Sequence, residues 1–209
     1  MALLRSLPEN ATLADLRRTY ADLLEKLRPY GHRLMRGPSP LSTGERELIA
    51  AFVSGVNSCR YCHGTHSLVA RAFGVDETVL VTSLDNVEVA PVDARLKPIL
   101  SYVRKLTETP SRMTAADAAT VYEARWSDEA LLYAVAVCAY FNNMNRLVEG
   151  AGILGNMEDY SIAARRLVDH GYLRSMERDK RRSGKSSKQA QPRHRSKRKV
   201  TTASRRSVT

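Results

Sequence analysis

The chain has 209 residues, of which 43% are hydrophobic and 26% are charged, and its formal net charge is +11. This length is enough for one substantial domain with a buried core. Two of the three cysteines are separated by only two residues, which is unlike a secreted disulfide framework. The first ten residues do not form a signal-peptide apolar region, and no run approaches the roughly 20 apolar residues that span a bilayer. We therefore expect a soluble, cytoplasmic protein without membrane association.

The positive charge is concentrated at one end of the chain. Residues 1–176 carry 20 Lys and Arg against 20 Asp and Glu, whereas residues 177–209 carry 13 against 2. The second segment is rich in Ser, Gln, Lys and Arg and has few large apolar residues, so it cannot bury enough surface to offset the entropy of ordering. We predict a neutral domain over residues 1–176, followed by a disordered basic tail over residues 177–209.

The domain is predicted to be all-α, because apolar residues recur at helical spacing and no segment alternates with the period of a strand. Capping boxes are expected at Thr12 and Ser42, and Pro29 is expected to end the first helix. Gly74 and Gly150 are expected just beyond helix ends. The predicted helices cover residues 12–28, 42–56, 59–73, 76–84, 91–109, a short stretch from 114, 127–148 and 161–170.

The reactive residues of the chain are concentrated in one short segment, from Cys59 to His66. Cys59, Cys62 and His66 are spaced i, i+3 and i+7, so on a helix they share one face. A cysteine at a helix start lies near unpaired N–H groups, which can lower a thiol pKa from about 8.5 to below 7.5. His66 can accept the proton of Cys62, and Glu47, twelve residues before Cys59, can orient or re-protonate the relay. This pattern predicts a redox-active dithiol.

Other interpretations of the same residues remain open. Cys59, Cys62 and His66, with Glu47 or His63, could ligate zinc, although a structural zinc site usually draws a second ligand pair from a distant segment. The Cys-x-x-Cys-His pattern also matches c-type haem attachment, which requires export. A thioredoxin-like motif would need a βαβ context, and the neighbouring segments are predicted helices.

A third cysteine and a basic cluster lie outside this segment. Cys138 lies in a very apolar helix and is expected to be a buried core thiol. The basic cluster at residues 193–199 would bind phosphates weakly and non-specifically. It lacks the interleaved aromatic residues that stack on bases, so any nucleic-acid contact is expected to be incidental.

The signature Glu47-x11-Cys59-x2-Cys62-x3-His66 resembles that of the AhpD-like alkylhydroperoxidase and carboxymuconolactone decarboxylase superfamily. Residues 41–74 and 133–153 resemble its uncharacterised peroxidase-related branch, and the resemblance covers about residues 10–175. Well-known members place a histidine just before the second cysteine, whereas this chain has Tyr61 there and His63 after it. That departure concerns the rate and the peroxide preference more than the class of reaction.

The resemblance implies an all-α homo-oligomer that reduces hydroperoxides with its dithiol, without a bound cofactor. It implies that Cys62 is the peroxidatic thiol, Cys59 the resolving thiol and His66 the base of Cys62, with Glu47 serving the relay on the Cys59 side. The implied partners are an organic hydroperoxide and a protein disulfide reductant. Two alternatives remain: a decarboxylase that acts on a lactone acid, and a redox-sensing protein in which the basic tail binds nucleic acid.

Overall fold

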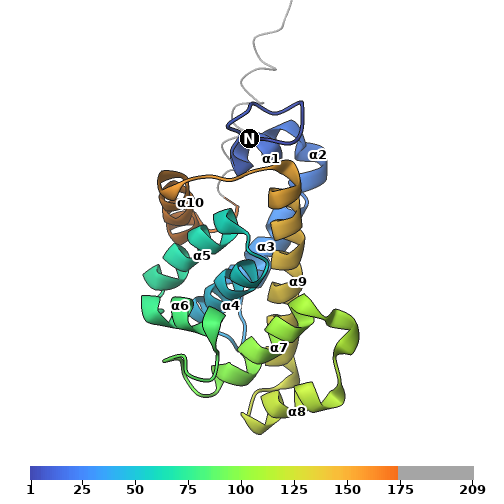
Figure 1. The fold of residues 1–209 in the computed structure, drawn as a ribbon, viewed down its shortest axis with the longest axis vertical. Helices are drawn as coiled ribbons and strands as arrows, with labels where there is room; N and C mark the ends of the chain where they lie inside the picture. Colours follow the sequence, from blue (N-terminus) through green and yellow to red (C-terminus); the bar gives the residue numbers. More distant parts are fainter. Residues whose placement is uncertain (174–209) are drawn as a thin grey trace, which may run out of the picture. The chain divides into compact units, whose positions relative to one another are not determined.

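A computed structural model describes residues 1–173, and these residues form helices without any strand, as predicted (Figure 1). The predicted basic tail lies outside the described residues. The helices are α1 (Leu13–Thr19), α2 (Ala21–Leu24), α3 (Leu27–Arg36), α4 (Thr43–Val56), α5 (Arg60–Ala72), α6 (Glu77–Asp85), α7 (Leu96–Glu108), a 3-10 turn (Pro110–Arg112), α8 (Ala115–Glu123), α9 (Asp128–Ala151) and α10 (Met157–His170).

Side-chain caps begin several helices at the predicted places. The Ser42 hydroxyl accepts a hydrogen bond from the N–H of Glu45, whose carboxylate accepts one from the N–H of Ser42 at 2.6 Å. The same reciprocal arrangement begins α1 at Thr12 and α8 at Thr114. Each cap satisfies N–H groups that the first helical turn leaves unpaired, which is why these short motifs could be placed from sequence.

Two of the prolines that guided the predicted boundaries, Pro29 and Pro91, were misread, whereas the helix expected to end before Pro110 does end at Glu108. Pro29 does not end a helix but lies in the first turn of α3, where its missing N–H has no helical partner to lose. Pro91 does not open α7, which begins at Leu96, because the Asp93 carboxylate accepts a hydrogen bond from the N–H of Arg95 at 2.9 Å and forms a local turn.

Two predicted boundaries near the C-terminal end were also wrong. Helix α9 passes through Gly150 to Ala151 and is capped by Gly152, which has a left-handed φ of 72°. Helix α10 begins at Met157 rather than near residue 161. The Asn156 side chain accepts hydrogen bonds from two N–H groups of its first turn, at 2.9 and 3.1 Å.

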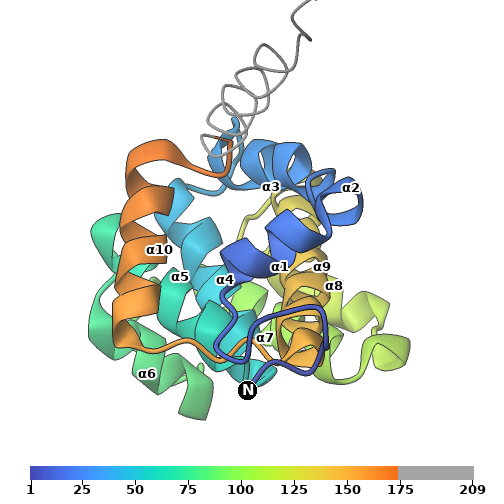
Figure 2. The same cartoon turned by 90° about the horizontal axis from the view of Figure 1, so that it is seen from above.

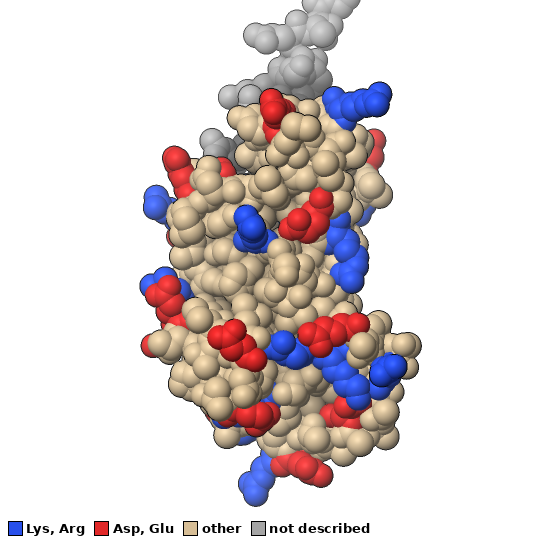
Figure 3. Space-filling model, viewed as in Figure 1, with Lys and Arg blue, Asp and Glu red and all other residues tan. Residues whose placement is uncertain are grey.

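Helix α4 lies between α5 and α9, and α10 packs on the other side of α5 (Figures 1 and 2). Ten of the eleven α4 residues from 44 to 54 are buried, and they include charged Arg46 and Glu47. Positive and negative side chains are mixed over the face seen in Figure 3. Among the helices of residues 1–173, none is long and apolar enough to cross a membrane.

Candidate functional site

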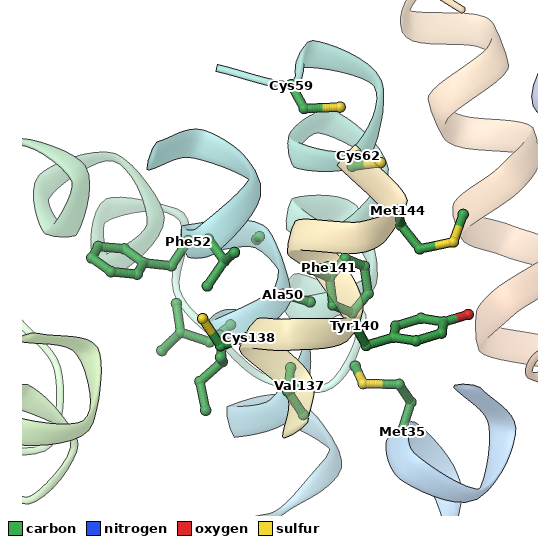
Figure 4. Packing of buried hydrophobic residues seen from close by; sticks show 14 of the residues in the cluster. Met35, Ala50, Phe52, Cys59, Cys62, Val137, Cys138, Tyr140, Phe141 and Met144 are labelled. Atoms are coloured by element: carbon green, nitrogen blue, oxygen red, sulfur yellow. The ribbon is translucent and has the colours of Figure 1, made fainter. Parts of the chain in front are cut away.

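The chain reverses between α4 and α5 directly before the cysteine pair. Ser58 has a left-handed φ of 56°, and the N–H of Cys59 donates a hydrogen bond to the carbonyl of Ser54 at 2.9 Å. This turn makes Cys59 the N-cap of α5 and places Cys62 in its first helical turn. Both are buried free thiols, and Figure 4 shows them on successive turns, with Cys62 nearer than Cys59 to Met144 of α9.

A buried ion pair supports the histidine of the site. The Glu47 carboxylate, with no exposed surface, accepts a hydrogen bond from Arg36 Nη1 on one oxygen and contacts His66 Nδ1 with the other, each at 2.6 Å. Burial alone would raise the pKa of Glu47, but the charges and hydrogen bonds of His66 and Arg36 together lower it. The carboxylate is therefore ionised at neutral pH.

This contact determines which nitrogen of His66 is free to act as a base. An ionised carboxylate only accepts hydrogen bonds, so Nδ1 of His66 must carry the proton that points at Glu47. The other ring nitrogen, Nε2, is then the atom that can accept a proton. The ring is held further by Phe141 of α9, which meets it edge to face at 4.5 Å between centroids.

The two thiols are electrostatically linked. A hydrogen bond with Cys62, burial, the negative charge of Cys62 and a hydrogen bond with Glu149 raise the pKa of the Cys59 thiol well above its ordinary value. The helix start was expected to lower this pKa, and the direction is the opposite because these effects favour the protonated thiol. Cys59 therefore keeps its proton at neutral pH.

Cys62 and His66 share the wall of one cavity enclosed by α1, α5, α9 and α10. Its other lining includes Leu13, Arg17, Tyr61, Thr65, Tyr140, Phe141, Met144, Ala163, Arg166, Leu167 and Tyr172. The cavity offers about 30 Å³ to the centres of water-sized molecules, which is room for one or two small polar atoms with their hydrogens. Cys59 is not in this wall, so the two thiols differ in their access to a ligand.

Two hydroxyl groups in the cavity wall have no hydrogen-bond partner within the described residues. They belong to Thr65 of α5 and to Tyr172, which follows α10, and both oxygens are buried. A buried hydroxyl without a partner costs free energy, on the order of 1–3 kcal/mol. A ligand with oxygen atoms would recover that cost by accepting or donating hydrogen bonds here.

The structure brings three of the four predicted site residues together: Cys62 and His66 line one cavity, and Glu47 contacts His66 from behind its wall. Cys59 adjoins Cys62. The described contacts of Glu47 are with His66 and Arg36 rather than on the expected Cys59 side, and the carboxylate near Cys59 is that of Glu149.

Sequence reasoning missed Arg36, Glu149 and Tyr172, because each reaches the site only through tertiary packing. Arg36 lies on α3, with its guanidinium over the rings of Phe73 and Tyr172 at 5.1 and 5.6 Å. No spacing rule links it to Glu47, eleven residues later on another helix. The signal that was available, an arginine in the last turn of a helix, is too common to be specific.

The remaining candidate residues lie away from this chemistry. His63 Nδ1 contacts the carbonyl of Ala51 at 2.9 Å, and His63 does not line the cavity. Cys138 is fully buried, as predicted, and contacts Thr107 and Asn142 at 3.3 Å. Within residues 1–173, no group of three or more His, Cys, Asp and Glu side chains could hold a metal ion, so the zinc interpretation lacks a ligand set there.

Known proteins are similar to this chain in sequence and in fold. The sequence profile of the carboxymuconolactone decarboxylase family matches residues 21–103, a range that includes Glu47, Cys59, Cys62 and His66. An uncharacterized peroxidase-related protein from Silicibacter sp. TM1040 is 30% identical, with 70% of this chain and 78% of that chain covered and a TM-score of 0.62.

A second solved structure agrees in its fold. It is described as an alkylhydroperoxidase AhpD core, an uncharacterized peroxidase-related protein from Ralstonia eutropha JMP134. It is 24% identical over 72% of this chain and 79% of that chain, with a TM-score of 0.65. No curated protein matches the chain. From the shared fold, the matched range and the identity to the Silicibacter protein, the chain belongs to the AhpD-like carboxymuconolactone decarboxylase superfamily.

Proposed function

We propose that the protein is a thiol peroxidase that reduces organic hydroperoxides, with Cys62 as the attacking thiol and Cys59 as the resolving thiol. The observation that supports this most strongly is the cavity wall shared by Cys62 and His66, with His66 oriented by the buried, ionised Glu47. The names of the two solved relatives, both peroxidase-related, support the same class of reaction.

The first step transfers one oxygen atom to sulfur. Nε2 of His66 accepts the proton of Cys62, and the resulting thiolate attacks the terminal oxygen of the hydroperoxide. The O–O bond breaks as the S–O bond forms, so Cys62 is oxidised to a sulfenic acid. The leaving alkoxide takes the proton from His66 and departs as an alcohol. The unpartnered hydroxyls of Thr65 and Tyr172 are available to hold the two peroxide oxygens.

The second step forms the disulfide and releases water. The sulfur of Cys59 attacks the sulfur of the Cys62 sulfenic acid, and the hydroxide that leaves combines with the Cys59 proton, whose release the nearby Glu149 carboxylate can assist. Turnover then needs two electrons from an external dithiol. In keeping with the family resemblance, we propose a protein disulfide reductant as their source and a homo-oligomer as the working form.

The test measures hydroperoxide consumption with cumene hydroperoxide as substrate and dithiothreitol as reductant. We expect turnover by the wild type and none by Cys62→Ser. Cys138→Ala is the matched control, because Cys138 is a buried thiol outside the cavity, and it should retain activity. Turnover by Cys62→Ser at the wild-type rate would refute the proposal, whereas lactone-acid decarboxylation that survives in Cys59→Ser, Cys62→Ser would favour the decarboxylase alternative, which needs no thiol pair.

A further inference from the structure

The cavity that contains Cys62 also has two cationic side chains in its wall. Arg17 comes from α1 and Arg166 from α10, so helices far apart in the sequence bring two guanidinium groups to one opening. Arg17 is half-buried, whereas Arg166 is exposed, so the pair lies toward the solvent side of a cavity whose thiol is buried. The cavity therefore has a reactive sulfur in its buried wall and positive charge on its solvent side.

Neither guanidinium has a carboxylate partner among residues 1–173. The neighbouring Arg28, by contrast, pairs with Glu25 at 3.2 Å and donates to the carbonyl of Tyr172. The surrounding protein lowers the pKa of Arg166, and the positive charges of Arg17 and Arg28 add to this effect, while Glu25 acts weakly in the opposite direction. Two like charges that repel each other at the edge of a cavity would be stabilised by an anion between them.

The shape and lining of the cavity indicate what kind of anion fits. The enclosed space is small, and its wall includes the thiol, the imidazole and two unpartnered hydroxyls, which suits a hydroperoxide group rather than a bulky anion. The rest of the wall is mostly apolar and aromatic, with Leu13, Tyr61 and Leu167 among its members. A ligand whose hydroperoxide group enters this space, while its apolar body and a negative group stay on the solvent side with the exposed Arg166, matches this lining.

We propose that Arg17 and Arg166 bind the carboxylate of the substrate, so that the enzyme prefers hydroperoxides of organic acids over neutral hydroperoxides. The planar guanidinium fork pairs with a carboxylate through two parallel N–H···O bonds. The carboxylate is not changed in the reaction; it positions the O–O bond at Cys62. This inference rests on the proposed peroxidase function for the reaction, but the anion site itself does not depend on it.

The kinetic test compares two substrates with the same reactive group, cumene hydroperoxide and its para-carboxylate. We expect the wild type to have a kcat/KM about tenfold or more higher for the carboxylate at low salt, as a charge-assisted contact permits. Arg17→Gln and Arg166→Gln should reduce this ratio to near one. The quantity compared is the ratio of the two kcat/KM values, because a general loss of activity lowers both kcat/KM values by the same factor. Arg165→Gln, an exposed neighbour outside the cavity, is the matched control and should keep the wild-type ratio.

A second measurement separates the anion site from the peroxidase reaction. Calorimetric titration with 4-isopropylbenzoate, which has no O–O bond, should show saturable binding that the Arg17→Gln, Arg166→Gln double variant loses and Arg165→Gln keeps. Such binding in a protein that consumes no hydroperoxide would refute the proposed function but support the anion site. Equal kcat/KM values together with no calorimetric binding would overturn the anion site, and inorganic phosphate binding as tightly as the benzoate would overturn the assignment to carboxylates.

Discussion

Replacing Glu47 by glutamine removes one negative charge from the centre of the Arg36–Glu47–His66 chain without changing its volume. In the wild type, both carboxylate oxygens make 2.6 Å contacts in a place with no solvent exposure. The glutamine amide cannot reproduce both contacts, because only its oxygen can accept a hydrogen bond. If that oxygen stays with Arg36, the amide N–H group faces Nδ1 of His66 and donates to it. The ring proton then moves to Nε2, the nitrogen that must accept the Cys62 proton.

The expected effects of Glu47→Gln are large for both activity and stability. Losing a positioned general base lowers rates by about 10²- to 10⁴-fold. Leaving Arg36 without its carboxylate costs about 3 kcal/mol of unfolding free energy, the lower end for a broken buried pair, because the amide keeps one hydrogen bond. At this chain length, 3 kcal/mol corresponds to a fall in Tm of about 6–12 °C.

The pH dependence of the stability loss follows from the lowered pKa of Glu47. Because the folded pKa lies below its ordinary value of 4.5, the stabilising contribution is complete above that pH and is lost as the pH falls through the folded pKa. The difference in unfolding free energy between the wild type and Glu47→Gln should therefore be constant from about pH 5 upward and shrink in acid.

The assays are denaturant unfolding followed by circular dichroism and stopped-flow measurement of hydroperoxide consumption. A second variant separates the two effects: Arg36→Met, Glu47→Leu removes both charges and should regain stability relative to Glu47→Gln, since no buried charge is left unpaired. Its activity should stay low, because His66 still lacks its acceptor. A Glu47→Gln protein with wild-type rate and Tm would refute the reasoning, as would recovery of activity in the double variant.

Three further predictions concern the turn and the helix around the thiols. Ser58→Gly should raise the unfolding free energy by about 0.5–1 kcal/mol, because glycine tolerates the left-handed φ of 56°; a loss measured by urea unfolding would count against strain there. Gly64→Ala should cost about 1–3 kcal/mol in the same assay, since a Cβ would lie 2.6 Å from the Tyr160 ring, and an unchanged midpoint would contradict this packing. In peptide mapping after iodoacetamide treatment, Cys59 should label more slowly than an unperturbed thiol both at neutral pH and at about pH 8.5, because its pKa is raised; rapid labelling at neutral pH would argue against that.

The local parts of this fold were predictable from sequence, and the reasons are visible in single residues. The capping boxes at Thr12, Ser42 and Thr114 use partners three residues away, so the sequence contains the whole interaction. The prolines were misread because a proline tolerated in a first helical turn and a proline that ends a helix look alike in sequence. In α3 the difference depends on how the chain packs before Leu27.

Only the part of the candidate site that lies on one helix was predictable from the sequence. The spacing of Cys62 and His66 on one helix predicted their shared face, and both line the same cavity. Glu47 was included by resemblance to the family signature, but its actual partners, Arg36 and Nδ1 of His66, depend on how α3, α4 and α5 pack together. The arginines at the cavity entrance come from helices about 150 residues apart in the chain, a separation at which sequence patterns contain no signal.

The central claim is that Cys62 takes the peroxide oxygen and Cys59 resolves it. The most direct test is the intact mass of the fully reduced protein after one equivalent of cumene hydroperoxide, measured for the wild type and for Cys59→Ser. We expect the wild type to lose two hydrogen atoms as the disulfide forms. Cys59→Ser should gain one oxygen atom, which peptide mapping with a sulfenic-acid reagent assigns to Cys62. Unchanged masses in both proteins, or an added oxygen on any residue other than Cys62, would contradict the account.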